Sequence, residues 1–234
     1  MSENIKKITK AFVVDLDSRE NQNILKPSAH PFNNQAHQVD EVAKKIYKLI
    51  KDAKHPNDDI ILNHNKIKEA FFSPFKPQLK SAQVFLSHSH ADKNKALEVK
   101  NYLESKTNHR VRVFIDSLFW DYKDDVLNEL EKYDDTSKIK DAFTLILRES
   151  LQDMIEKCPY FVFLQSNNSV SCNQDLSCIT YSAWIYEELK IAHSIRESRP
   201  TPMMESMQVS HNISPFLESL ETITLSKLSH IINS

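Results

Sequence analysis

The sequence predicts an α/β fold in which a five-stranded parallel sheet follows an N-terminal helical extension. From residue 81 onward, short apolar runs alternate with longer segments whose apolar residues recur at helical spacing. Such an alternation is typical of parallel strands joined by right-handed crossover helices. Before it, the stretch from Phe72 to Ala82 contains Pro74 and Pro77, which disfavour both helices and central strands. We therefore expect a boundary near residue 80, between an extension at residues 1–80 and a domain at residues 81–234.

The extension, residues 1–80, shows little regular periodicity. Apolar residues at helical spacing predict an amphipathic helix over Val39–Ala53, and a second helix is expected within Ile60–Phe72. Ala11–Leu16 has the composition of a short strand, whereas Arg19–Ala36 has the prolines and asparagines of an irregular segment. Because these elements are too few for an independent core, residues 1–80 are expected to pack on residues 81–234 or on a partner.

The domain at residues 81–234 supplies the strands of the sheet. They are expected at Gln83–Ser87, Val111–Ile115 and Tyr160–Leu164, with weaker candidates at Met204–Val209 and Glu221–Leu225. The helices are expected at Asp92–Ser105, Asp124–Tyr133, Phe143–Cys158, Ser182–Arg196 and Ser226–Ile232. This order of elements is that of a flavodoxin-like domain.

The composition argues against several classes of protein. The 234 residues include no glycine, so the chain has no glycine-rich dinucleotide fingerprint, no Walker A loop and no Gly-x-Ser-x-Gly nucleophile turn. The formal net charge of -2 argues against a nucleic-acid or anionic-membrane binder. No segment has the apolar length of a signal peptide or of a membrane span.

The cysteines and histidines give no sign of a disulfide framework or of a metal site. Cys158, Cys172 and Cys178 are odd in number and lack Cys-x-x-Cys spacing. His88 and His90 are two residues apart, but no other histidine or cysteine cluster joins them by spacing. The sequence therefore predicts reduced thiols in a cytoplasmic protein, with no metal and no resident cofactor.

In parallel α/β sheets ligands bind at the carboxyl ends of the strands, so the residues there are candidates for a binding site. After the first two predicted strands these residues are Ser87, His88, Ser89, His90, Asp116, Ser117 and Trp120. His88 and His90 would line a pocket, whereas Ser89 or Asp92 is of a type that caps the following helix. Asp116 either braces the turn after its strand or contacts substrate.

Three sequence boxes, in this order, resemble those of the Toll/interleukin-1 receptor (TIR) domain family. The first is F-x-S-x-x-x-x-D, with Phe85, Ser87 and Asp92, and the second is V-F-x-D, with Val113, Phe114 and Asp116. The third is S-x-W-x-x-x-E-L, with Ser182, Trp184, Glu188 and Leu189. The resemblance covers about residues 81–230, and the Asp-Ser-Leu-x-Trp form of the second box is most similar to bacterial TIR proteins of Thoeris-type antiphage systems.

The resemblance implies that the chain hydrolyses or cyclises NAD as its substrate and that Glu188 is the catalytic residue. One carboxylate suits this chemistry, because nicotinamide leaves as a neutral group and the transition state places positive charge on the ribose. Trp184, one helical turn before Glu188, would wall the pocket or pack in the core. The neighbouring Glu187 is interpreted as a surface residue, and the loops after the first two strands would complete the pocket.

The resemblance also implies partners. TIR domains associate with one another, here through the loop that carries Phe119 and Trp120, and in prokaryotic immunity the product reaches a downstream effector. Two other functions stay open. One is a non-enzymatic TIR module that signals by homotypic assembly. The other is an enzyme similar to nucleoside deoxyribosyltransferases, which also place a glutamate at the sugar.

Overall fold

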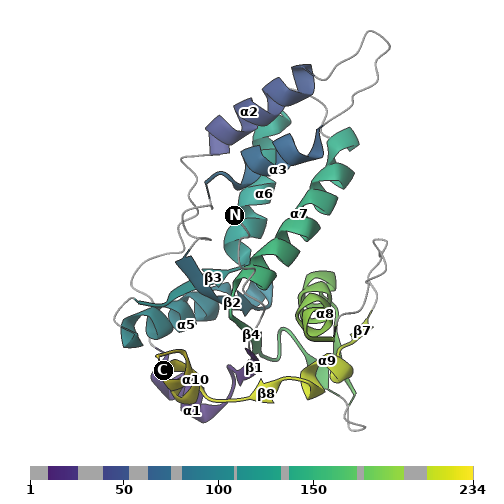
Figure 1. Ribbon diagram of the computed structural model, residues 1–234. Coiled ribbons are helices and arrows are strands. Elements are labelled where there is room, and N and C mark those ends of the chain that lie inside the picture. The colour runs from purple at the N-terminus through teal and green to yellow at the C-terminus, as the bar shows by residue number, and fades with distance from the viewer. Residues whose placement is uncertain are drawn as a thin grey trace. The chain divides into compact units, whose positions relative to one another are not determined.

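The computed structural model describes residues 10–25, 39–52, 63–74, 81–107, 110–132, 137–172, 177–197 and 210–233 (Figure 1). The strands are β1 (Lys10–Asp15), β2 (Ala82–Ser87), β3 (Arg112–Ile115), β4 (Tyr160–Gln165), β5 (Ser171–Cys172), β6 (Cys178–Thr180), β7 (His211–Asn212) and β8 (Glu221–Thr222). The helices are α1 (Arg19–Ile24), α2 (Val39–Asp52), α3 (His64–Phe72), α5 (Lys93–Lys106), α6 (Ser117–Leu130), α7 (Ser137–Lys157), α8 (Ala183–Glu197), α9 (Ser214–Glu218) and α10 (Leu225–Asn233). A 3₁₀ turn, η2, lies at His90–Asp92.

The main sheet confirms the predicted fold class. Its five strands are all parallel and follow the order β3-β2-β4-β1-β8. Strands β1, β2 and β4 are nearly continuous buried runs, as expected for a parallel sheet with helices on its faces. The ring of Phe85 on β2 stacks on Phe114 of β3 and on Phe161 of β4, with ring centres 5.9 Å apart in each pair.

Strand β1 belongs to the part of the sequence that is expected to be an extension. It lies between β4 and β8, and its six residues pair with β4 from Lys10 opposite Tyr160 to Asp15 opposite Gln165. The compact unit that holds the sheet, here called the sheet unit, consists of residues 1–32, 81–117 and 152–234. The division of the chain therefore differs from the single boundary expected near residue 80.

The second compact unit, here called the helical unit, consists of residues 33–80 and 118–151. Helix α2 matches the predicted helix at Val39–Ala53, and its buried stripe is formed by Val42, Ala43, Ile46 and Ile50. Phe71 on α3 lies edge-to-face against Tyr122 of α6 and Phe143 of α7, with ring centres 5.2 and 5.7 Å apart. Helices from two distant chain segments thus share one aromatic core.

Helix α6 begins earlier than the sequence predicts. The expected helix starts at Asp124 after a loop, whereas the observed helix starts at Ser117, directly after β3. The segment contains no proline or glycine that would stop a helix, and the Asp116 carboxylate accepts the N–H of Ser117 at 2.7 Å. The predicted loop is therefore helical in its backbone. The side chains of Leu118–Asp121, Trp120 among them, lie outside the described residues.

A small antiparallel sheet has the order β5-β6-β7, in which β5 and β6 precede α8 in the chain and β7 follows it. Cys172 and Cys178 lie opposite each other in it and form a disulfide. The prediction of reduced thiols is wrong for this pair, because a hairpin brings directly opposed side chains onto the same face. Cys158 is free and buried, and burial raises the pKa of its thiol to about 12.

The weaker predictions have mixed outcomes. Strand β8 and helix α10 confirm the expected elements at Glu221–Leu225 and Ser226–Ile232, whereas the candidate strand Met204–Val209 lies outside the described residues. Among the helices of the described ranges, none is long and apolar enough to cross a lipid bilayer.

Candidate functional site

Two groups of polar side chains gather at the carboxyl edge of the main sheet. The Glu188 cluster consists of Ser87, His88, Asp116, Ser117 and Glu188, and the Asp92 cluster consists of Asp17, Asp92, Lys95, Ser166 and Asn168. The chain passes from β2 to β3 on one side and from β4 to β8 on the other. The topological switch point therefore lies between β2 and β4, at the edge where such sheets bind ligands.

Helix α8 carries Glu188 on its buried stripe. Ile185, Leu189 and Ala192 are buried at helical spacing, and Glu188 lies three residues after Ile185 on the same face. Local hydrogen bonds fix where the helix begins: the Ser182 hydroxyl accepts the N–H of Ile185 at 3.2 Å, in the manner of a helix cap. The helix thus turns a carboxyl group toward the interior.

Glu188 is completely buried, with 0% of the residue exposed. Among the described residues, neither its carboxyl oxygens nor the Ser87 hydroxyl has a hydrogen-bond partner of good geometry. Burial raises the pKa of Glu188 well above its ordinary value of 4.5, the Asp116 carboxylate raises it further, and the Ser87 hydroxyl partly opposes them. Glu188 is therefore a neutral acid at pH values where a surface glutamate is ionised.

His88 and Asp116 form a buried pair beside Glu188. The Nε2 atom of His88 lies 3.0 Å from Asp116 Oδ1 and 3.1 Å from the Ser117 hydroxyl, and Nδ1 lies 2.6 Å from the carbonyl oxygen of Ser89. Burial alone would lower the pKa of His88, but the charge and hydrogen bond of Asp116 outweigh it, so the pKa lies above 6.5. Asp116 therefore favours the cationic form of His88.

The remaining sequence candidates differ in how far they are exposed. Ser89 contributes its carbonyl oxygen rather than its side chain, and His90 is exposed on η2. Trp184 is half-buried on α8. The side chain of Trp120 is outside the described residues. The structure thus brings Ser87, His88, Asp116, Ser117 and Glu188 together and leaves His90 at the surface.

Glu187 is not the surface residue that the sequence predicts. Only 7% of it is exposed, and its carboxylate lies 4.0 Å from the ammonium group of Lys190. Two consecutive glutamates of α8, Glu187 and Glu188, are therefore buried. Glu187 is therefore a poor control for a variant at Glu188.

The Asp92 cluster is not apparent from the sequence. Asp92 occupies the position before α5, but it makes no capping bond there; its carboxylate instead accepts hydrogen bonds from the Ser166 hydroxyl and, at 2.9 Å, from the Asn168 amide. Asp17 accepts the N–H of Asn167 at 2.9 Å and pairs with Lys95 at 3.2 Å. The ends of β1 and β4 and the start of α5 are thus joined by side chains far apart in sequence.

No family model matches the chain, and neither a curated protein nor a solved structure does. Within the described residues, no group of three or more His, Cys, Asp or Glu side chains could hold a metal ion.

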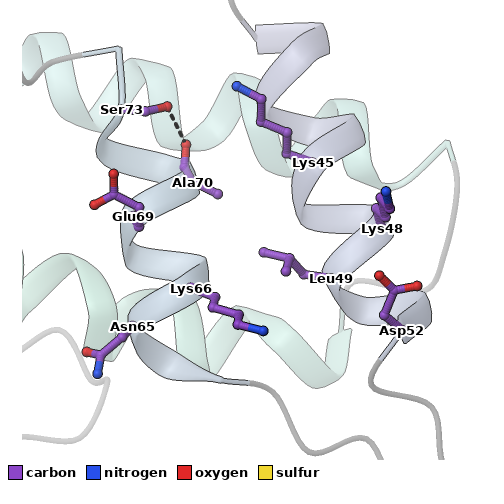
Figure 2. Close-up of a pocket in the computed structure, with 9 residues that line it drawn as sticks. All are labelled: Lys45, Lys48, Leu49, Asp52, Asn65, Lys66, Glu69, Ala70 and Ser73. Carbon is purple, nitrogen blue, oxygen red and sulfur yellow. Dashed lines mark hydrogen bonds between the residues drawn. The ribbon is translucent and has the colours of Figure 1, made fainter.

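A separate open groove of about 700 Å³ lies in the helical unit, between α2 and α3 (Figure 2). Leu49 points from α2 into it, and Lys45, Lys48 and Lys66 stand around it. None of the residues expected at the NAD site lines this groove.

Proposed function

We propose that the chain is a TIR-domain enzyme that cleaves NAD by hydrolysis or cyclisation, with Glu188 as the catalytic carboxyl. One observation carries the proposal: Glu188 is a completely buried carboxyl at the carboxyl edge of a parallel sheet, and it has no hydrogen-bond partner of good geometry among the described residues. An unpaired buried carboxyl destabilises a fold, and such groups with a perturbed pKa concentrate at functional sites.

The protein contributes to this reaction mainly by electrostatic stabilisation. The bond between ribose C1′ and the nicotinamide nitrogen breaks, and its electron pair leaves with neutral nicotinamide. Water, or a nitrogen of the adenine ring in the cyclase case, then attacks C1′, and water loses a proton to solvent. Ionised Glu188 would stabilise the positive charge on the ribose, with Ser87 and Asp116 nearby.

Complete burial of Glu188 means that substrate reaches it only after the groups around it move. This supports the further proposal that self-association through TIR domains opens or completes the site. The proposed setting is a cytoplasmic antiphage system in which a downstream effector senses the product. If assembly controls the site, specific activity must rise with protein concentration; activity per mole that stays flat from dilute to concentrated protein would exclude it.

A second candidate has one observation in its favour. The Asp116 carboxyl lies close enough to Glu188 to raise its pKa, and paired carboxyls also serve glycosyl transfer, as in nucleoside deoxyribosyltransferases. In that reaction Glu188 would attack C1′ of a deoxynucleoside as the bond from C1′ to the first base breaks, and that base would leave with the electron pair and take up a proton. A second base would then attack C1′, lose a proton and release the Glu188 carboxylate.

The test is to incubate the purified protein with NAD and to separate nicotinamide, ADP-ribose and cyclic products by chromatography. Glu188→Gln removes the carboxylate and keeps the size, and Glu218→Gln is the matched control because Glu218 is exposed on α9 in the same unit. The proposal is supported if the wild type and Glu218→Gln release nicotinamide and Glu188→Gln does not. Base exchange on deoxynucleosides with NAD left intact would favour the second candidate, and inactivity toward both would favour a non-enzymatic TIR module.

A further inference from the structure

The ring nitrogens of His88 both face hydrogen-bond acceptors. A carbonyl oxygen can only accept, so the contact of Nδ1 with the Ser89 oxygen at 2.6 Å requires a hydrogen on Nδ1. The contact of Nε2 with Asp116 Oδ1 at 3.0 Å places a second hydrogen on Nε2 when that carboxylate is ionised. The geometry is therefore that of an imidazolium cation, which agrees with the raised pKa of His88.

Asp116 has the contacts of an ionised carboxylate. Its Oδ1 atom accepts the N–H of Ser117 at 2.7 Å and faces His88 Nε2 at 3.0 Å, so two donors converge on one oxygen. Glu188, by contrast, receives no donor of good geometry from the described residues. Of the two neighbouring carboxyls, Asp116 therefore carries the negative charge and Glu188 keeps its proton.

The buried cluster is electrically neutral in this arrangement. His88 contributes one positive charge, Asp116 one negative charge, and protonated Glu188 none. Ionising Glu188 would leave a net charge of one in a buried site, which is costly unless a cation enters.

We propose that the Asp116 carboxylate, whose charge is partly balanced by the His88 cation, keeps Glu188 protonated in the free protein and thereby selects a cationic N-glycoside, whose charge ionises Glu188 on binding and releases its proton to solvent. In this role His88 is a positioning residue, because it acts through Asp116. The inference rests on the proposed function for its substrate, but the protonation of Glu188 does not depend on it. The class of ligand is a glycoside with a positively charged leaving base, as in NAD.

The charged groups around the pair are few in the described part of the chain. Asp92 adds a weak attraction to the charge of His88, and Glu187 and Lys190 on α8 lie against each other. The Ser87 hydroxyl on β2 favours the ionised form of Glu188 and so opposes Asp116. The side chain of Asp121 on α6 is outside the described residues.

The pair predicts opposite effects for its two members. Asp116→Asn removes the negative charge beside Glu188, so Glu188 will ionise at lower pH. His88→Gln removes the positive charge that balances Asp116, so Glu188 will ionise at higher pH. If His88 and Asp116 only support the structure, both variants will loosen the site. The pKa of Glu188 will then fall in both variants, toward that of a surface carboxyl.

The experiment is infrared spectroscopy of the carbonyl stretch of protonated carboxylic acids, followed from pH 5 to pH 9. The Glu188 band is assigned by its loss in Glu188→Gln. We expect the midpoint of its disappearance to fall by at least about one pH unit in Asp116→Asn and to rise by at least that much in His88→Gln, a roughly tenfold change in proton affinity each way. His230→Gln is the matched control, since His230 is exposed on α10.

Shifts in one direction only, or a wild-type protein without a Glu188 band at pH 6, would overturn the proposal. If a variant does not fold, the nitrogen NMR signals of His88 in the wild-type protein still decide: hydrogens on both ring nitrogens at pH 7 support the assignment, and a neutral tautomer contradicts it. None of these readouts uses NAD cleavage. A protein that passes them and leaves NAD intact would refute the proposed function alone.

Selection of a cation is tested by binding. A carbocyclic NAD analogue, which keeps the charged nicotinamide but cannot be cleaved, should release close to one proton per site, measured by calorimetry in buffers of different ionisation enthalpy. NADH, whose dihydronicotinamide is uncharged, should release none, and Glu188→Gln should release none with either ligand. Equal proton release with both ligands would refute selection by charge.

Discussion

The Glu188 and Asp92 clusters lie at the same edge of one sheet, yet their polar groups are satisfied to different degrees. In the Asp92 cluster, both oxygens of Asp92 and both oxygens of Asp17 accept hydrogen bonds or pair with Lys95. In the Glu188 cluster, the Ser87 hydroxyl and both oxygens of Glu188 are without such partners in the described part of the chain. A satisfied network holds strand ends together, whereas an unsatisfied carboxyl is kept at a cost to stability and points to a function.

The largest difference between the two clusters is expected in the enzymatic activity of their variants. Removing the charge in Glu188→Gln takes away the main electrostatic stabiliser of the transition state, which typically lowers the rate by about 10²–10³-fold. Asp92→Asn keeps the size and most hydrogen-bonding capacity of Asp92, so the folded fraction should retain NAD cleavage. The measurement is nicotinamide release per mole of folded protein. A fall of similar size in Asp92→Asn would mean that the Asp92 cluster belongs to the active site as well.

The free energy of unfolding should instead be lowered more by a variant in the Asp92 cluster than by one in the Glu188 cluster. Asp92→Ala leaves the buried Ser166 hydroxyl without its acceptor, and a buried polar group left unpaired costs about 1–3 kcal/mol, whereas the exposed Asn168 amide can bond to water instead. Glu188→Gln should not lower the free energy of unfolding at neutral pH, because it removes a carboxyl that resists burial in its charged form. Urea titrations of both variants check this. Greater destabilisation by Glu188→Gln than by Asp92→Ala would contradict the division between the clusters.

The pH dependence of stability should have opposite signs in the two clusters. Glu188 and His88 have raised pKa values, so the folded state binds more protons than the unfolded state. For each group, stability therefore falls as pH rises from its ordinary pKa to its pKa in the folded state. The ordinary pKa is 4.5 for Glu188 and 6.5 for His88. One proton corresponds to a slope of about 1.4 kcal/mol per pH unit. Asp17 has a lowered pKa, through the N–H of Asn167 and then Lys95, so its contribution is lost as pH falls below 3.8.

Urea midpoints between pH 5 and pH 8 test this sign. The midpoint of the wild type should decline relative to that of Glu188→Gln, which lacks the titrating group. A wild-type midpoint that rises in parallel with the variant would show that Glu188 titrates normally.

The smallest effect is expected at Lys95. Its ammonium group is partly exposed and lies 3.2 Å from Asp17 and 3.9 Å from Asp92. Exposed ion pairs typically contribute about 0.2–1 kcal/mol, so Lys95→Met should change the free energy of unfolding by no more than that. A larger loss would show that Lys95 is needed to balance the buried Asp92, and urea titration at low and high salt would reveal it.

The sequence predicts much of the sheet unit because its signals are local. The strands β2, β3 and β4 are short apolar runs, and the periodicity of Ile185, Leu189 and Ala192 predicts α8. The rule that strand ends carry ligands directs attention to Ser87, His88 and Asp116, which the structure places around Glu188.

The features that the sequence does not predict depend on contacts between distant residues. The hydrogen bond from Ser166 to Asp92 spans 74 residues and has no local signature, so Asp92 resembles an ordinary helix cap. The burial of Glu187 depends on what covers α8 rather than on its own periodicity. The protonation of Glu188 likewise depends on Asp116, which lies on another element.

The position of β1 in the sheet has a consequence for synthesis of the chain. Its partner β4 follows 150 residues later, so at about 5–20 residues per second the strand waits roughly 8–30 s before it can pair. During that time the apolar run Ala11–Val14 is an unpaired edge, which favours association between nascent chains. Pairings of such sequence separation also slow folding, because the loop must close before the contacts stabilise it. We therefore expect the newly made chain to depend on chaperones until β4 emerges from the ribosome.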